Sequence, residues 1–181
     1  MRVLTALLLS VAVPAYGADW KMDPAASKLE FAATSEKTPA PGVFRKFDTK
    51  MSFDPAKPGG TLDVTIDISS ADMTNGDVNK AIAGPEWFDF SKFPKAEFHS
   101  TDIRSAGGNR YVARGVLSLK GAQQPVEVPF TWDPSADGGA GMDGEFTVKR
   151  GAFSIGTGEW APTNVIGADV KVKFHVRLRK G

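Results

Sequence analysis

Apolar and polar residues alternate along most of this 181-residue chain, and this period of two constrains the fold more than any other feature. In one clear example, Leu62, Val64, Ile66 and Ile68 alternate with polar residues. Such alternation is typical of β-strands that bury one face and expose the other. It predicts about eight strands, around residues 29–33, 47–53, 62–68, 98, 111–119, 126–132, 142–148 and 170–178.

The connections between these segments are short and rich in glycine and proline. They include AKPGG, SAGGN, KGAQQP and DPSADGGAG, which leave no room for the crossover helices that parallel strands need. An all-β domain with antiparallel strands is therefore expected. The only predicted helix covers residues 74–83, between the third and fourth strands, with Thr74 as its N-cap and Val78 and Ile82 facing inward.

An all-β chain of this kind can form a two-sheet sandwich or a closed barrel, and periodicity alone does not distinguish them. Eight is the strand number at which closed barrels enclose one small ligand. The inner faces combine large rings, such as Phe130 and Trp132, with small residues, such as Ala113 and Gly115. The small residues either leave space for a lipophilic ligand or accommodate neighbouring rings in a filled core.

The stretch GPEWFDFSKFPKAEFHS, which begins at Gly84, concentrates aromatic residues in a segment that suits neither a helix nor a strand. In a barrel, the segment 87–93 would lie against one end or side of the sheet, where two prolines fix the backbone and Trp87 and either Phe90 or Phe93 bury their rings. Two roles are open for these rings. They either seal the barrel as a packing cluster, which is the commoner role of loop aromatics, or touch a ligand directly.

The first 17 residues are typical of a secretory signal peptide. Arg2 is followed by an apolar run, residues 3–13, that is too short to span a bilayer, and Ala15 and Gly17 form a small-x-small cleavage site. We therefore expect cleavage near Gly17-Ala18, export to the periplasm and a mature domain of residues 18–181. No other stretch has transmembrane length, so stable membrane insertion is not expected.

Cysteine usage and charge exclude several classes of function. The chain has no cysteine, which excludes disulfides, thiolate metal sites and a cysteine nucleophile. Removal of Arg2 with the leader changes 22 basic and 21 acidic residues to 21 of each. A formally neutral chain gives no electrostatic reason to expect nucleic acid as a partner.

Four motifs, taken in order, resemble the YceI-like family. They are GVFRKFDTKMSFDP, DVNKAIAGPEWFDFSKFPKAEFHSTDI, GVLSLKGAQQPVEVPF, and GAFSIGTGEW followed by VIGADVKVKFHVRL, and together they span essentially the whole mature chain. One element departs from the family pattern. Many members carry an R-D-x-H-L-type motif in the helix, where this chain has GDVNKAI from Gly76 to Ile82, so contacts from that helix cannot be transferred as a set.

The resemblance implies an eight-stranded antiparallel lipocalin-like barrel whose apolar lumen holds a polyisoprenoid, such as a quinone or polyprenyl chain, or a similar long-chain lipid. The implied function is non-catalytic binding or carriage in the periplasm, with loose specificity. A homodimer is compatible with the sequence. The candidate lumen residues are the inward positions of the alternating segments: Phe31, Phe47, Met51, Phe53, Ile66, Ile68, Leu117, Leu119, Phe130, Trp132, Phe146, Val172 and Phe174.

Catalytic and metal-binding motifs find no positive support in the sequence. Residues 156–161 match the G-x-G-x-x-A motif of dinucleotide-binding sites, but that motif requires a helix to begin there. Here Pro162 and further turn residues follow, so the segment is expected to be a loop. His99 and His175 are the only histidines, and neither accompanies a nucleophile elbow or a third metal ligand. We therefore expect no catalytic residue, metal or cofactor. The alternative function is a β-sandwich-type protein-interaction module with a filled core and no lipid ligand.

Overall fold

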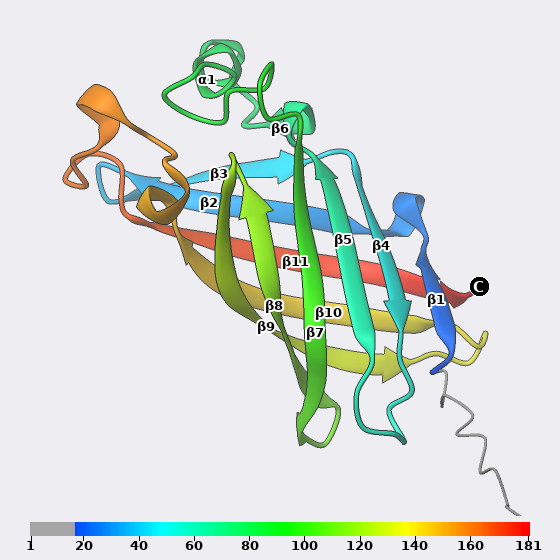
Figure 1. Cartoon of the computed structure of the whole chain (residues 1–181). Coiled ribbons are helices and arrows are strands. Elements are labelled where there is room, and N and C mark those ends of the chain that lie inside the picture. Colours follow the sequence, from blue (N-terminus) through cyan, green and yellow to red (C-terminus); the bar gives the residue numbers. More distant parts are fainter. Residues whose placement is uncertain (1–16) are drawn as a thin grey trace, which may run out of the picture.

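The alternating segments form the strands of one antiparallel sheet that closes on itself, as the computed structural model of residues 17–181 shows (Figure 1). The predicted signal peptide falls almost wholly on residues outside this range. The strands are β1 (Asp19–Met22), β2 (Lys28–Ser35), β3 (Thr38–Phe44), β4 (Phe47–Ser52), β5 (Thr61–Asp67), β6 (Ala71–Asp72), β7 (Lys95–Gly107), β8 (Arg110–Leu119), β9 (Ala122–Pro134), β10 (Ala140–Lys149) and β11 (Asp169–Lys180). One α-helix, α1 (Gly76–Ile82), and four short 3₁₀ turns complete the fold: η1 (Pro24–Ala26), η2 (Ile68–Ser70), η3 (Arg150–Phe153) and η4 (Gly158–Trp160).

Closure of the sheet depends on three bent strands. The segments β1 and β2 both pair with β11, while β1 also pairs with β4 and β2 with β3. The segments β3 and β4 are likewise two halves of a second strand, and β5 and β6 are two halves of a third, because β4 pairs with β5 and β3 with β6. Counted in this way the barrel has eight strands, with the helix between the third and fourth. The predicted fold class is confirmed.

The sequence did not predict the halves β1, β3 and β6, which are short or contain proline. Pro39 and Pro41 lie in β3, which pairs with β2 along its whole length but with β6 only at Val43 and Phe44. Proline is tolerated there because its missing N–H belongs to the edge without a partner strand. At the bend between β1 and β2, the Asp23 carboxylate accepts a hydrogen bond from the Ala25 N–H at 3.1 Å and thereby caps η1.

Aromatic side chains close the end of the barrel near the C-terminus, which we call the floor. Trp20 packs edge-on against Trp132 at 4.9 Å between ring centroids, and Phe53 packs edge-on against Trp132 at 5.0 Å. The Trp20 indole N–H also donates to the Phe53 carbonyl at 2.9 Å. Tyr111 and Phe130 stack beside these rings at 5.6 Å, so the floor is filled by large side chains.

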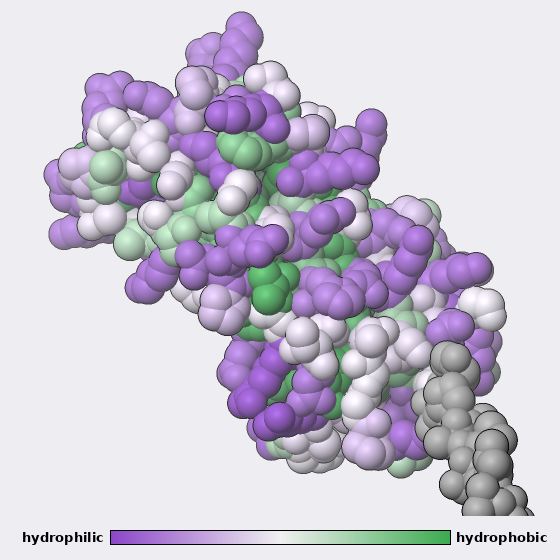
Figure 2. Space-filling model, in the orientation of Figure 1, coloured by the Kyte–Doolittle hydropathy of each residue, from purple (hydrophilic) through white to green (hydrophobic). Residues whose placement is uncertain are grey.

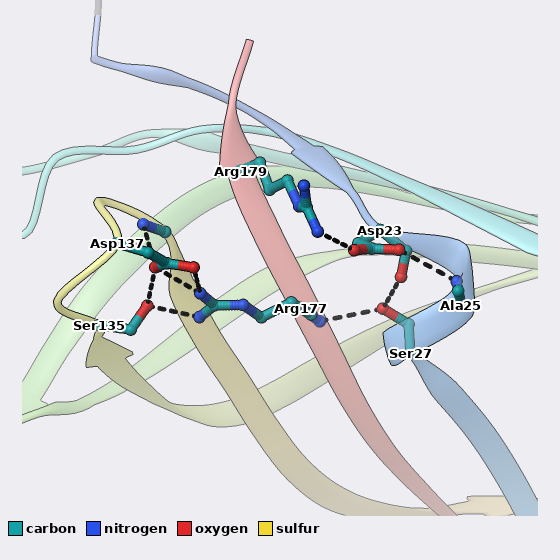
Figure 3. Close-up of polar contacts among 8 residues, drawn as sticks. Asp23, Ala25, Ser27, Ser135, Asp137, Arg177 and Arg179 are labelled. Carbon is teal, nitrogen blue, oxygen red and sulfur yellow. Dashed lines mark hydrogen bonds and ion pairs between the residues drawn. The ribbon is translucent and has the colours of Figure 1, made fainter.

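Hydrogen bonds and ion pairs connect β11 to the loops at the floor end of the barrel (Figure 3). The Arg177 guanidinium donates two hydrogen bonds to Asp137 and one to the Ser135 hydroxyl, each at 2.6 Å. These bonds, led by those from Arg177, hold the pKa of the Asp137 carboxyl well below its usual range. The Arg177 backbone N–H donates to the Ser27 hydroxyl at 3.0 Å, so β11 is joined both to the β9–β10 loop and to the bend before β2.

The helix α1 lies across the opposite end of the barrel, as Figure 1 shows. Its N-cap is Asn75, which accepts from the N–H groups of Asp77 and Val78 at 3.0 and 3.1 Å. The prediction of Thr74 as cap was wrong by one residue, because Thr74 has a positive φ of 57° and precedes the cap. Ile82 is buried as predicted, whereas Val78 is exposed.

The aromatic stretch after α1 packs over the same end, and we call α1 with residues 83–94 the cover. The Phe88 ring packs edge-on against Phe31 and Phe44 at 6.2 and 6.1 Å. Trp87 contacts Trp160 at 5.7 Å, which joins the cover to the loop after β10. These ring contacts join the cover to the sheet and to the loop, and they leave Phe31 buried.

A buried arginine organises the loop of residues 150–168 beside the cover. Arg150 is 3% exposed. Its guanidinium donates to six backbone carbonyls, at 2.8–3.2 Å, those of Ile155, Gly156, Trp160, Pro162, Ile166 and Gly167. Burial lowers the pKa of this guanidinium, which nevertheless stays charged at neutral pH. Its centre also lies 5.9 Å from the Trp87 ring. One side chain thus fixes the path of the whole loop.

Replacement of this arginine should destabilise the protein more than replacement of an exposed one. Arg150→Met leaves several buried carbonyls without a donor, and we expect a loss of about 2–4 kcal/mol in the free energy of unfolding. Chemical denaturation measures this, with Arg104→Met as the control because Arg104 pairs with Asp102 on an exposed surface. Equal effects of the two changes would contradict the assigned role.

Acid should selectively weaken the attachment of α1 to β6. Asp72 accepts hydrogen bonds from Asn79, the Thr74 N–H and Arg45, which together lower its pKa to about 2. A carboxylate whose pKa is lower in the folded than in the unfolded state stabilises the protein at any pH above its unfolded pKa, about 3.9. This stabilisation is lost as the pH falls through the folded pKa. The stability difference between wild type and Asp72→Asn should therefore shrink between about pH 5 and pH 2. A stability difference between the two proteins that stays constant across this pH range would refute the role of the Asp72 carboxylate.

Candidate ligand cavity

An apolar cavity fills the barrel between the floor and the cover. Its walls are the inward side chains of every strand except β1 and β6, supplemented by Ile68 of η2. The lining residues are Leu29, Phe44, Phe47, Thr49, Leu62, Val64, Ile66, Ile68, Ala96, Phe98, Leu117, Leu119, Val126, Val128, Met142, Phe146, Val148, Val172, Phe174 and Val176. No ionisable side chain is among them.

The cavity is narrow relative to its extent. The cavity has a volume of about 110 Å³. Pockets for small molecules are commonly larger, about 300–1,000 Å³, so the space within the ligand-free barrel is small as well as apolar. A slender chain fits such a shape better than a broad ring system does, and the lining offers it dispersion contacts and burial from water.

Most of the predicted lumen residues line this cavity: Phe47, Ile66, Ile68, Leu117, Leu119, Phe146, Val172 and Phe174. The others lie beyond its two ends. Met51, Phe53, Phe130 and Trp132 are buried in the core around the floor. Phe31 belongs to the cluster beneath the cover, where its ring is 4.8 Å from that of Phe44. Alternation identifies the inner face of a strand, whereas depth along the barrel depends on the register with neighbouring strands.

The candidates did not include several residues that line the cavity. Leu62 and Val64 carry the same alternation as Ile66 and could have been chosen by it. Phe44 lies in β3, a half-strand that the sequence did not predict. Thr49 occupies the inward position between Phe47 and Met51, and only its polar character removed it from an apolar list.

Thr49 is the one polar residue in the lining. It is 1% exposed, and within the described part of the chain its hydroxyl is the only buried side-chain N or O atom without a hydrogen-bond partner. Ser100 is equally buried, but its hydroxyl accepts from the Leu62 N–H at 2.7 Å. An unpaired buried hydroxyl costs about 1–3 kcal/mol, so Thr49 lowers the stability of the ligand-free protein.

The hydrogen-bonded ladder between β9 and β10 is short, and we call the unpaired stretch of these two strands the lateral gap. The ladder between them covers only four residue pairs, from Ala140 opposite Pro134 to Asp143 opposite Thr131. Beyond these pairs the two strands diverge toward the loop of residues 150–168 (Figure 1). Val126, Phe146 and Val148 line the cavity here and are only half-buried. Figure 2 shows apolar residues between polar ones on the face of the molecule that it presents.

Two prolines account for the lateral gap. Pro125 and Pro129 both lie within the continuous ladder between β9 and β8, so their missing N–H groups belong to the edge that faces β10. The spacing of four places both on the same side of the strand. This part of β9 therefore lacks two of the donors that pairing with β10 would need.

Contacts from the loop and the cover restrict the top of the lateral gap. Phe153 of η3 is buried in the main core, and the Gln124 side chain donates to the Ala152 carbonyl at 3.3 Å. The Lys120 ammonium donates to the carbonyls of Pro85 and Ser154, both at 2.7 Å, and so joins the cover to the loop. Burial lowers the pKa of this ammonium, while the charge of Asp89 opposes the shift.

The titratable pairs lie outside the cavity. His175 contacts Asp143 at 2.7 Å, and His99 contacts Asp63, in both cases with exposed side chains on the outer surface. Within residues 17–181, no group of three or more His, Asp or Glu side chains is arranged to hold a metal ion.

No helix in the same range is long and apolar enough to cross a membrane.

Comparison with known proteins places the fold among solved relatives. The crystal structure of BcnA from Burkholderia cenocepacia is 38% identical, with a TM-score of 0.83 over 86% of this chain and 98% of that one. A polyisoprenoid binding domain from Saccharophagus degradans is 14% identical, with a TM-score of 0.72 over 90% of this chain and 98% of that one. The second similarity concerns the fold alone.

Sequence comparison identifies the family. A UPF0312 protein from Azotobacter vinelandii is 32% identical over 120 residues, which cover 63% of this chain and 62% of that protein. The matched region is thus less than two thirds of that relative's length. The family model of the YceI-like domain matches residues 20–178, from β1 to the end of β11. The chain belongs to the YceI-like domain family.

Proposed function

We propose that this protein is a non-catalytic carrier that holds a long-chain lipid in the barrel, and that the lipid is a polyisoprenoid, such as a quinone or polyprenyl chain, or an acyl chain of similar shape. The observation that carries the proposal is the narrow cavity with a lining that is apolar at every position except Thr49. Such a lining provides no charged group for catalysis or for a charged ligand, but it suits an aliphatic chain along its whole length.

The free energy available from burial supports a chain as the ligand. Each buried CH₂ contributes about 0.8 kcal/mol, so a dozen contribute on the order of 10 kcal/mol before the costs of association. A neutral hydrogen bond contributes only about 1 kcal/mol net. Shape and apolar lining therefore suffice for binding, and specificity between chains that differ by one methylene should be low.

The lateral gap supplies a route by which a long chain could reach the cavity. Val126, Phe146 and Val148 line the cavity beside this unpaired stretch and are only half-buried. The floor is filled by interlocking aromatic rings, and the cover is pinned by Lys120 and Trp87. Only four residue pairs join β9 to β10, and the prolines of β9 lack two of the donors that further pairing would need.

Two relatives agree with the proposal without determining the ligand. The Saccharophagus degradans domain is a polyisoprenoid binding domain with the same fold. The BcnA structure, at 38% identity, extends the similarity over nearly all of its own chain. We also propose that the protein is exported to the periplasm through its leader, residues 1–17, where a carrier would shield a lipid tail from water.

A bulky residue in the cavity wall should block binding, whereas the same residue on the outside should not. Leu117 lines the cavity and its neighbour Val116 is exposed on the same strand. Leu117→Trp should weaken binding of geranylgeraniol at least about tenfold, since losing two buried methylenes already costs about 1.6 kcal/mol. Val116→Trp is the matched control and should bind like wild type. Titration followed by native mass spectrometry gives the occupancies, and circular dichroism checks that both variants fold.

Two outcomes would contradict the carrier proposal. Unchanged binding by folded Leu117→Trp would show that the lipid lies elsewhere. Absence of binding by the wild type, to geranylgeraniol and to longer prenols and quinones, would remove the proposed function altogether.

A further inference from the structure

The hydroxyl of Thr49 is a polar atom placed inside an otherwise apolar cavity. Thr49 lies on β4 and is paired in register with Val64 of β5, another lining residue. Met51, two residues further along β4, pairs with Trp20 and lies in the core at the floor. Thr49 therefore lies in the deeper part of the cavity, away from the cover.

No protein group satisfies this hydroxyl, although the other buried polar groups are satisfied. The three buried polar or charged residues of the described chain are Thr49, Ser100 and Arg150. Ser100 and Arg150 each make hydrogen bonds to the backbone, whereas the Thr49 oxygen makes none. Valine has nearly the same shape as threonine and would avoid the cost of an unpaired buried hydroxyl. A hydrogen-bond partner that enters the cavity would account for the presence of threonine at this position.

We infer that Thr49 forms a hydrogen bond with a single uncharged oxygen of the bound lipid, a hydroxyl or a carbonyl, and that this polar end of the lipid enters the deeper part of the cavity. This inference rests on the proposed function. It narrows the ligand class from any long chain to a lipid with a neutral oxygen function near one end.

The remaining lining explains why the oxygen must be uncharged. A phosphate or carboxylate at the depth of Thr49 would need a counter-charge or several donors, and none of the other lining residues has a polar side chain. Arg150 cannot supply the charge, because six carbonyls already occupy its N–H groups. A hydroxyl or carbonyl requires only one partner, which Thr49 provides as donor or acceptor.

Two probes of the same shape test this inference directly. 1-Hexadecanol and heptadecane differ by the exchange of one hydroxyl for a methyl group. Competition binding of both to wild type and to Thr49→Val gives the preference of each protein for the alcohol. Thr49→Val should reduce that preference about tenfold, because the alcohol loses its partner while the hydrocarbon is relieved of an unpaired hydroxyl. Thr49→Ser keeps a hydroxyl and should keep most of the preference.

The outcomes separate this inference from the proposed function. Equal preferences in wild type and Thr49→Val, with both probes bound, would overturn the role of Thr49 and leave the carrier proposal intact. If the wild type binds neither probe nor any other long-chain lipid, both proposals fail together. Thr49→Ala should show the same reduced preference, so the test does not depend on one variant being well folded.

Discussion

Closure of the sheet through β11 is the constraint on which the rest of this structure depends. One edge of β11 pairs with β10 over ten residues, and the other pairs with β2 and then with β1 around the bend at η1. A closed sheet has an inside that is separated from water, so every inward side chain must pack or line a space. The Arg177 contacts to Ser27, Ser135 and Asp137 lie beside this junction and hold it in place.

Inside the closed sheet, side-chain size determines which part is filled and which part stays open. The rings of Trp20, Phe53 and Trp132 meet at the floor and leave no space. Further along the barrel several inward positions carry smaller aliphatic residues, such as Ala96, Val128 and Val176, and a cavity remains. Empty apolar space lowers stability, because the lining loses contacts. A ligand chain that fills the space would restore those contacts, which links the architecture to the proposed function.

Much of this architecture could be predicted from the sequence, since alternation reports directly which face of a strand is buried. The eight strands, the single helix and the family follow from patterns of neighbouring residues. Depth along the barrel does not, because it depends on register: Phe47 lines the cavity and Phe53, on the same face six residues later, is buried at the floor. The sequence analysis also did not predict the lateral gap, although Pro125 and Pro129 indicate it. Which edge of β9 lacks their N–H groups is known only once β8 is placed beside that strand.

Thr49 shows a different limit of sequence reasoning. A threonine within an alternating strand is ordinary, and its meaning depends on whether a neighbour satisfies the hydroxyl. Only the packed structure shows that Ser100 has a backbone partner while Thr49 has none. Polar residues on the inner face of a strand are therefore worth retaining as candidates even when the expected ligand is apolar.

The most direct test of the central claim, that the barrel holds a long-chain lipid, is mass spectrometry of an organic extract from protein purified out of a periplasmic fraction. An unrelated periplasmic protein taken through the same steps is the control. The account predicts a prenyl or acyl lipid with a neutral oxygen function, in an amount comparable to the protein. An extract that contains no such lipid, and still contains none after incubation with quinones, polyprenols and long-chain alcohols, would contradict it.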